Sequence, residues 1–353
     1  MRDYNRLINN ISSSYNPESS MVVENRMFTD LSGIDRNVAK FVKLAMSAVD
    51  DSYTLRSKQA GNNAKDWLMA EQHNVDYAFQ GSVMTNTHIK GYSDIDLLTF
   101  CTKFYGSEIN IVRNILRTPN NYSWREVDIL RNFEQNFEPY TGSCLQDLRD
   151  LRLENERILS KHYSICDTSK AKSIRIKNQN LNMDVDVVTA NKHESIQYIL
   201  KDYDDKYLGV RIYDKEKNCQ LDVDYPFLRI QLMNNRGIET GDHFKKMIRF
   251  LKNVRSQADT KIDLTSFEIN SICYDIPTWK YSAAYYLQLV NIVYEKIFSI
   301  CTNQMEADRL KSVDGAEYVF RNKPDKVRHL RILMLEVKKI IDDLQSSNKR
   351  IIY

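Results

Sequence analysis

The sequence predicts an α+β fold, in which a small mixed sheet with flanking helices is followed by a helical C-terminal lobe. Runs that alternate between apolar and polar residues occur before residue 226, and this alternation is typical of strands with one buried face. After Pro226 apolar residues recur mainly at helical spacing. The 353 residues are enough for two lobes, each with its own core. We therefore expect a core lobe over residues 1–225 and a helical lobe over residues 226–353.

The first part of the core lobe is predicted to be helical. Residues 1–25 are polar, and we expect them to be irregular. Asp35 is a suitable N-cap for one long helix through "RNVAKFVKLAMSAVDDSYTLRSKQ", whose apolar residues keep helical spacing. A second helix is expected over residues 64–72. A short strand at residues 76–79 and a turn at Gly81-Ser82 then lead to the strand "SDIDLLTF".

The remaining elements follow from the same two periodicities. Helices are expected in "REVDILRNFEQNF" and "LQDLRDLRLENERIL", and strands in "KSIRIKN", "LNMDVDVVTA" and "VRIYDKE". Beyond Pro226 the helical segments are "FLRIQLMNNR", "GDHFKKMIRFLKNVRSQ", "TSFEINSICY", "SAAYYLQLVNIVYEKIFSI" and residues 326–345.

Composition excludes several classes of protein. Apolar residues make up 42% and charged residues 27%, which is typical of a soluble globular protein, and a net charge of +3 does not indicate nucleic-acid binding over the whole surface. The six cysteines are widely spaced without a C-x-x-C pair, so we expect reduced thiols in a cytoplasmic protein. The N-terminus lacks a signal-peptide pattern, and no apolar run approaches the ~18 residues of a membrane span.

Two carboxylates one residue apart stand out in the strand "SDIDLLTF". Residues i and i+2 of a strand point to the same face, so Asp94 and Asp96 project together, away from Ile95 and Leu97. Like charges on a partly buried face repel each other and raise each other's pKa. A divalent cation removes this cost, and Mg²⁺ prefers carboxylates, phosphates and water as ligands. A solvent-facing pair on an edge strand is the simpler alternative.

D-x-D also occurs at Asp184/Asp186 and at Asp222/Asp224. The first of these pairs lies on a second strongly alternating strand. The other precedes Pro226 without such a strand, and we interpret it as surface at the lobe junction. Gly81-Ser82 precedes Asp94 by a short polar stretch, where a glycine that enters a helix would let backbone N–H groups and the Ser82 hydroxyl reach a phosphate. This order is the layout of a two-metal nucleotidyl-transfer site.

The ordered motifs resemble those of the polymerase-β-like nucleotidyltransferases, and among them the bacterial CD-NTases (the cyclic GMP-AMP synthase/DncV-like enzymes). The resemblance covers about residues 35 to 340. The family's first motif matches Gln80-Gly81-Ser82, Thr87-His88-Ile89-Lys90-Gly91 and Ser93-Asp94-Ile95-Asp96-Leu97-Leu98. Its third carboxylate matches Asp186 in "VDVVTA", where Thr189 stands at the usual proline. Asp184 falls outside the motif.

The helical lobe carries two further matches. An R-x-x-K helix stands at Arg249 to Lys252, and the following helix start, "LTSFEI", contains Ser266, with Thr265-Ser266 in place of the common Ser-Ser. The resemblance implies that Lys252 and Ser266 contact the triphosphate of the donor nucleotide. It also assigns nucleotide binding to Gln80, Gly81, Ser82 and Ser93. The other basic residues of that helix are interpreted as solvated, and His88 and most of Tyr281, Tyr285 and Tyr286 as structural.

The resemblance implies a two-lobed enzyme that binds NTP in a cleft closed by the helical lobe. Asp94, Asp96 and Asp186 would bind two Mg²⁺, with Mn²⁺ as a substitute, while ATP, GTP, UTP or CTP is joined into a cyclic or short linear oligonucleotide with release of pyrophosphate. The implied setting is antiphage (CBASS) signalling by a monomer, with room for a regulatory protein partner. The zinc insertion of the animal DNA sensor is absent, so activation by double-stranded DNA is not implied.

Two other functions stay open at this point. One is a nucleotidyltransferase that modifies a non-nucleotide acceptor, such as a drug, a tRNA or a protein, and shares the three carboxylates. The other is a nucleotide-binding sensor without catalysis, against which the intact set of carboxylates argues.

Overall fold

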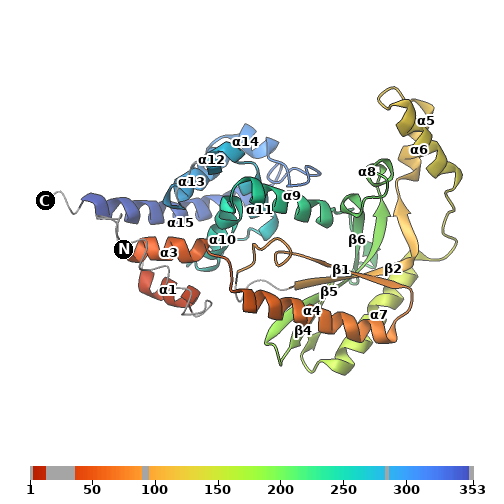
Figure 1. Ribbon diagram of the computed structural model, residues 1–353, viewed down its shortest axis with the longest axis horizontal. Helices are drawn as coiled ribbons and strands as arrows, with labels where there is room; N and C mark the ends of the chain where they lie inside the picture. The colour runs from red at the N-terminus through yellow and green to blue at the C-terminus, as the bar shows by residue number, and fades with distance from the viewer. Residues whose placement is uncertain (1–2, 13–35, 90–94, 283–285, 350–353) are drawn as a thin grey trace. The chain divides into compact units, whose positions relative to one another are not determined.

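The computed structural model describes residues 3–12, 36–89, 95–282 and 286–349 (Figure 1). The chain divides into two compact units. One consists of Met1–Thr54, Thr85–Ser93 and Leu232–Tyr353, and the other of Leu55–Met84 and Asp94–Gln231. We call them the helical unit and the sheet unit. This division differs from the expected lobes of 1–225 and 226–353, because the N-terminal helices pack with the C-terminal ones.

A mixed sheet is the centre of the sheet unit. Its strands lie in the order β1 (Val75–Gln80), β2 (Ile95–Ser107), β5 (Met183–Glu194), β4 (Ile174–Asn178) and β3 (Cys166–Asp167). β6 (Gly209–Asp214) also pairs with β5, and β7 (Cys219–Gln220) pairs with β6. β2 and β5 run parallel, whereas the other pairs are antiparallel. The small mixed sheet expected from the sequence is confirmed.

Helices cover one face of this sheet. On that face α4 (Asp51–Glu71) brings Gly61 close to Ile95, and α7 (Cys144–His162) brings Asn155 within hydrogen-bond distance of Thr99 and Thr189. The residues of β2 and β5 that alternate with Ile95, Thr99 and Thr189 point to the opposite face, where an apolar cluster forms. That cluster contains Leu98, Phe100, Val188, Ala190 and Val210. Asp96 and Asp186 belong to this second face because each lies two residues before a member of the cluster.

The other helices of the sheet unit form a small satellite core. They are α5 (Ile109–Arg117), α6 (Trp124–Gln135) and α8 (Ile196–Leu200), with the short η1 (Asp205–Tyr207) after them. Val112, Leu130 and Ile199 meet in the centre of this group. A capping box at Ser123 and Glu126 fixes the start of α6, because each residue satisfies a backbone N–H of the other.

Helices build the described part of the helical unit around one extended core. They are α1 (Tyr4–Ser12), α3 (Arg36–Met46), α10 (His243–Ser256), α11 (Ser266–Tyr274), α12 (Thr278–Ser282), α13 (Tyr286–Thr302), α14 (Gln304–Arg309) and α15 (Pro324–Lys349), and α9 (Pro226–Glu239) begins in the sheet unit and ends here. Fully buried aliphatic and aromatic side chains of α3, α10, α13 and α15 meet in this core. The predicted helical C-terminal region is thus confirmed.

Two local expectations were wrong. The long helix predicted after Asp35 is interrupted: α3 ends at Met46 and α4 begins at Asp51. The side chain of Asp50 accepts a hydrogen bond from the Ser52 N–H at 2.8 Å, which starts a new helix at the expense of continuing the old one. In addition, Gly81-Ser82 leads into turns rather than into a helix. In the described part of the chain, no helix has the length and apolar character needed to cross a membrane.

Candidate active site

Two of the predicted carboxylates are direct neighbours in the sheet. Asp96 of β2 and Asp186 of β5 are register partners in the parallel ladder, although ninety positions separate them in the sequence. Both lie on the face opposite α4 and α7. Burial, and secondarily the negative charge of Asp186, raises the pKa of Asp96 to about 7. The folded chain therefore places a carboxyl group where its ionised form needs a cation.

Gly81 follows directly after β1 and touches this carboxyl group. Its φ is +90°, a conformation that residues with a side chain rarely adopt. A Cβ atom here would lie 2.5 Å from Oδ2 of Asp96, closer than any real contact. Gln80, the last residue of β1, is the register partner of Asp96. The Gln80-Gly81-Ser82 motif therefore lies against the carboxylates, and only glycine fits in its middle.

Two basic residues that the sequence analysis did not single out face Asp186. Nζ of Lys170 lies 3.4 Å and Nε of Arg175 lies 3.5 Å from Oδ1 of Asp186. Arg175 is also the register partner of Asp186 across the β4–β5 ladder. The alternation in "KSIRIKN" does predict a strand with Arg175 on its polar face, but the pairing partner of that strand depends on the fold. These cations contact one carboxylate of the pair, whereas Asp96 forms no salt bridge with any residue in the described part of the chain.

The other predicted acidic residues are placed as follows. Asp94 and Ser93 lie outside the described residues. Within the part of the chain that is described, no group of three or more His, Cys, Asp or Glu side chains could hold a metal ion. Asp222 is exposed and Asp224 forms an ion pair with Arg229, in agreement with a surface role for that pair.

Asp96 and Asp186 fit a divalent cation by their chemistry. Both are hard oxygen donors on one face, and the pKa of Asp96 is raised mainly because its charge is buried. A cation bound there would lower that pKa again and remove the repulsion between the two carboxylates. The residues present are thus suited to metal binding, with Asp94 as the further expected ligand.

Lys252 belongs to the helical unit and is fully buried. Its Nζ donates a hydrogen bond to the carbonyl oxygen of Thr87 at 2.9 Å. Burial first, and then the positive charges of Arg255 and Arg249, lowers the pKa of Lys252 to about 7. Arg249 binds the same segment, through the carbonyl oxygen of Asn86 at 2.7 Å. Two cations of α10 therefore hold the chain between Thr85 and Ile89, a few residues after the Gly81-Ser82 turn in the sequence.

Comparison with known proteins identifies the family of this chain. The family model for the cGAS/DncV-like nucleotidyltransferase C-terminal helical domain matches residues 231–342. A c-di-GMP synthase from Lachnospiraceae bacterium strain RUG226 is 46% identical over 342 residues, which cover 97% of this chain and 99% of the relative. The chain belongs to the cGAS/DncV-like nucleotidyltransferases, or CD-NTases.

Solved structures of this family match the whole chain. A STING-associated CdnE c-di-GMP synthase from Flavobacteriaceae sp. has a TM-score of 0.84 at 33% identity, covering 98% of this chain and 99% of that one. The corresponding enzyme from Capnocytophaga granulosa has a TM-score of 0.77 at 38% identity, covering 98% and 99%. This CD-NTase is a nucleotidyltransferase that synthesises cyclic oligonucleotides, and like its family it uses a divalent metal ion and nucleotide substrates.

The remaining expected residues of this CD-NTase lie in the helical unit. Ser266 is the first residue of α11, where backbone N–H groups are free of helical partners and anions are favoured. Thr265 caps this helix in a capping box with Glu268. His88 is fully buried, with Nε2 3.0 Å from Oγ1 of Thr54, and Tyr281 is buried with its hydroxyl bonded to the Cys273 carbonyl oxygen. Tyr285 lies outside the described residues.

Proposed function

We propose that this CD-NTase joins two molecules of GTP into c-di-GMP, with release of two molecules of pyrophosphate. The observation that carries the choice of product is that three similar proteins, from Lachnospiraceae bacterium, Flavobacteriaceae sp. and Capnocytophaga granulosa, are c-di-GMP synthases. Each comparison extends over at least 97% of this chain. Choice of base depends on side chains throughout a nucleotide site, so similarity over the full length favours the same substrate.

The proposed metal ligands are Asp94, Asp96 and Asp186, with two Mg²⁺ ions and Mn²⁺ as a substitute. The raised pKa of Asp96 supports this assignment, because a buried carboxyl group is ionised at neutral pH most readily when a cation lies beside it. Bound metal would neutralise the charge that develops on the phosphoryl oxygens during transfer.

The protein's own residues would then bind, orient and exchange protons with the nucleotides. Ser82, Ser93 and the backbone around Gly81 would hold phosphate oxygens beside the carboxylates. Lys252 would supply a point charge to the triphosphate of the donor, and the N–H groups at Ser266 would donate hydrogen bonds to another of its anionic oxygens. Asp186 would accept the proton from the attacking ribose hydroxyl, which removes the positive charge that forms on that oxygen.

The proposed biological role is antiphage (CBASS) signalling in the cytoplasm. Support comes from the two solved relatives that are described as STING-associated. In this proposal the protein acts as a monomer and releases its product to a STING-like receptor, and a regulatory protein rather than double-stranded DNA controls it.

The proposal is tested by incubating the purified protein with each labelled NTP and with every pair of NTPs, in Mg²⁺ or Mn²⁺, followed by phosphatase. We expect a phosphatase-resistant product from GTP alone, and its loss in the double variant Asp94→Asn, Asp96→Asn with an unchanged circular dichroism spectrum. Lys252→Met should raise KM for GTP, whereas Lys246→Met, on the same helix, should not. A product that requires ATP would overturn the guanine assignment, and full activity of the double variant would overturn the site.

A further inference from the structure

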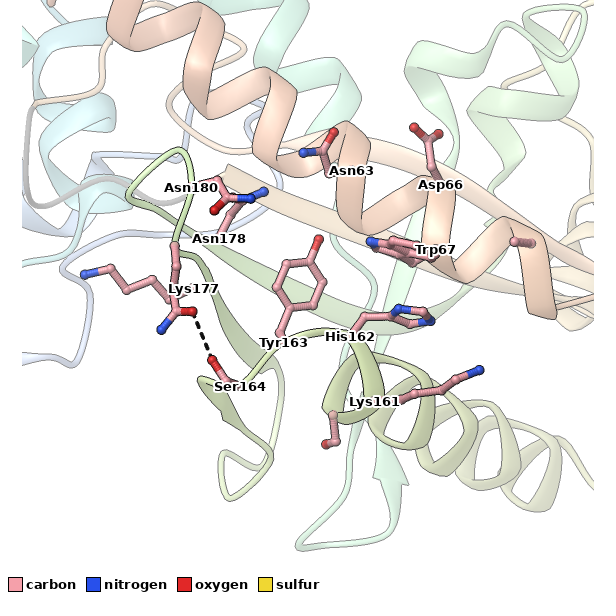
Figure 2. Close-up of a pocket in the computed structure, with 13 residues that line it drawn as sticks. Asn63, Asp66, Trp67, Lys161, His162, Tyr163, Ser164, Lys177, Asn178 and Asn180 are labelled. Carbon is pink, nitrogen blue, oxygen red and sulfur yellow. Dashed lines mark hydrogen bonds between the residues drawn. The ribbon is translucent and has the colours of Figure 1, made fainter.

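A cavity lies in the sheet unit, on the face of the sheet that α4 and α7 cover. It has a volume of about 790 Å³ and is lined by α4, by the end of α7 with the residues that follow it, and by the end of β4 with its turn (Figure 2). Its volume falls within the range of small-molecule sites in proteins. Asn178, which lines the cavity, points to the same face of β4 as Ile174 and Ile176, and this is the face that α4 and α7 cover. Asp96 and Asp186 are on the other face. The sheet therefore separates the cavity from the carboxylates.

Tyr163 presents an unused hydrogen-bonding group in this cavity. Its side chain is only 9% exposed, yet in the described part of the chain its hydroxyl has no hydrogen-bond partner. Figure 2 shows the ring rising from the end of α7 with the hydroxyl directed toward the α4 side of the cavity. Burial, together with the charge of Asp66, raises the pKa of Tyr163 to about 12, so the hydroxyl keeps its proton and can donate it. A buried hydroxyl without a partner is unfavourable unless a ligand supplies one.

Trp67 forms a fixed aromatic wall beside Tyr163. Its ring stacks on His162 with centroids 3.8 Å apart and an angle of 14° between the planes, and 45% of the residue remains exposed. Nε2 of His162 lies 3.2 Å from Oε1 of Glu71, which also accepts a hydrogen bond from Lys161 at 2.9 Å. The indole is thus held in place before any ligand arrives, which lowers the entropic cost of binding.

The other lining groups define the chemistry of a ligand. Carboxamides come from Asn63, Asn178, Gln179 and Asn180, and each carries both donors and an acceptor, as the edges of nucleobases do. Asp66 and Lys161 contribute one charge of each sign to the lining, and Nζ of Lys161 is bonded to Glu71. The side chain of Lys177 leaves β4 on the face opposite that of Asn178, because successive residues of a strand alternate. An aromatic surface and mixed hydrogen-bonding groups without an excess of charge suit the base and ribose of a nucleoside.

We infer that this cavity is a site for a nucleoside moiety, distinct from the candidate catalytic carboxylates. The base lies against Trp67 and the carboxamides, and the Tyr163 hydroxyl donates a hydrogen bond to the base or to its ribose. The inference does not depend on which NTP is polymerised or on whether turnover occurs.

Trp67 makes the site measurable on the full-length protein. Tryptophan occurs three times in the sequence, and Trp124 and Trp279 are 78% and 70% exposed, so a variant with both replaced by Phe should fold and retain Trp67 as its single indole. This variant is titrated in EDTA with 5′-GMP, guanosine or inorganic phosphate while its indole emission is recorded. We expect a saturable change with guanosine and with GMP at similar affinity, and no response to phosphate.

Tyr163→Phe in the same background separates ligand binding from structure. Because the hydroxyl has no partner among the described residues, the variant should keep or raise the melting temperature, yet it should bind GMP about tenfold more weakly. Tyr140→Phe is the matched control, since it removes a hydroxyl that binds Asp147 outside the cavity, and its GMP affinity should not change. Absence of a saturable change with guanosine, a response to phosphate alone, or unchanged GMP affinity in Tyr163→Phe would overturn the inference, whatever the outcome of the synthesis assay.

Discussion

At the scale of single residues, the candidate active site depends on the absence of a side chain at one position. Gly81 combines a φ of +90° with a position where a Cβ atom would meet the Asp96 carboxylate. The conformational requirement and the steric one have separate physical origins. The first costs stability in any protein, whereas the second acts on the candidate catalytic carboxylate itself.

Gly81→Ala is predicted to abolish most activity with a modest loss of stability. The new methyl group must displace Asp96, and misplacement of a reacting group by about 1 Å costs on the order of 100-fold in rate. The positive φ should cost about 1–2 kcal/mol of unfolding free energy. The measurement is kcat for GTP together with urea unfolding.

Gly241→Ala provides the control for this prediction. Gly241 also has a positive φ, of +56°, but a Cβ atom there would meet no atom of the described residues within 4 Å. It should lose a similar amount of stability and keep its kcat. Equal effects of the two substitutions on kcat would show that backbone strain, and not the contact with Asp96, is responsible.

At the scale of elements, a buried polar network joins α7 and the residue that follows α4 to strands β1, β2 and β5. Asn155 of α7 donates to the hydroxyl oxygens of Thr99 at 2.8 Å and Thr189 at 3.1 Å, and accepts from Nε2 of Gln72 at 2.8 Å. The hydroxyl of Tyr77 donates to the other end of Gln72 at 2.7 Å. Thr189 stands where proline is usual in the family, and this network gives its hydroxyl a structural use.

Asn155→Leu is predicted to destabilise the sheet unit by about 2–4 kcal/mol. The substitution keeps the side-chain size but leaves the buried amide of Gln72 and two threonine hydroxyls without their partner. Asn132→Leu on the exposed side of α6 should change stability by less than about 0.5 kcal/mol. Urea unfolding of both variants checks this, and similar stabilities would show that the network contributes nothing.

At the scale of the whole molecule, stability is expected to depend on pH through Asp96. Its pKa is raised from 3.8 to about 7 in the folded protein, so the folded state binds a proton more tightly than the unfolded state. Folding therefore gains stability below pH 4, and this contribution is lost as the pH rises through 7. Lys252, whose pKa is lowered to about 7, acts in the opposite direction, so the contribution of Asp96 is isolated by comparison with a variant that lacks its carboxyl group.

Between pH 5 and pH 8 in EDTA, the native protein should lose about 2–3 kcal/mol more stability than Asp96→Asn, which cannot ionise. Added Mg²⁺ should restore stability at pH 8 to the native protein and not to the variant, because the cation binds the ionised carboxylate. Chemical unfolding at the two pH values measures both effects. Parallel pH profiles for the two proteins would contradict the raised pKa.

The sequence by itself determined the alternation of strands, the helical C-terminal region and the selection of Asp96 and Asp186 as candidate carboxylates on polar faces, since these follow from local periodicity and from motif order. Only the tertiary structure decided that Asp96 and Asp186 are register partners, that Arg175 faces Asp186, and that the N-terminal helices pack with the C-terminal ones. It also decided that Asp50 interrupts the long predicted helix and that the Tyr163 hydroxyl has no partner among the described residues. Pairing, burial and orphaned groups arise from contacts between residues far apart in the chain, which a local pattern does not specify.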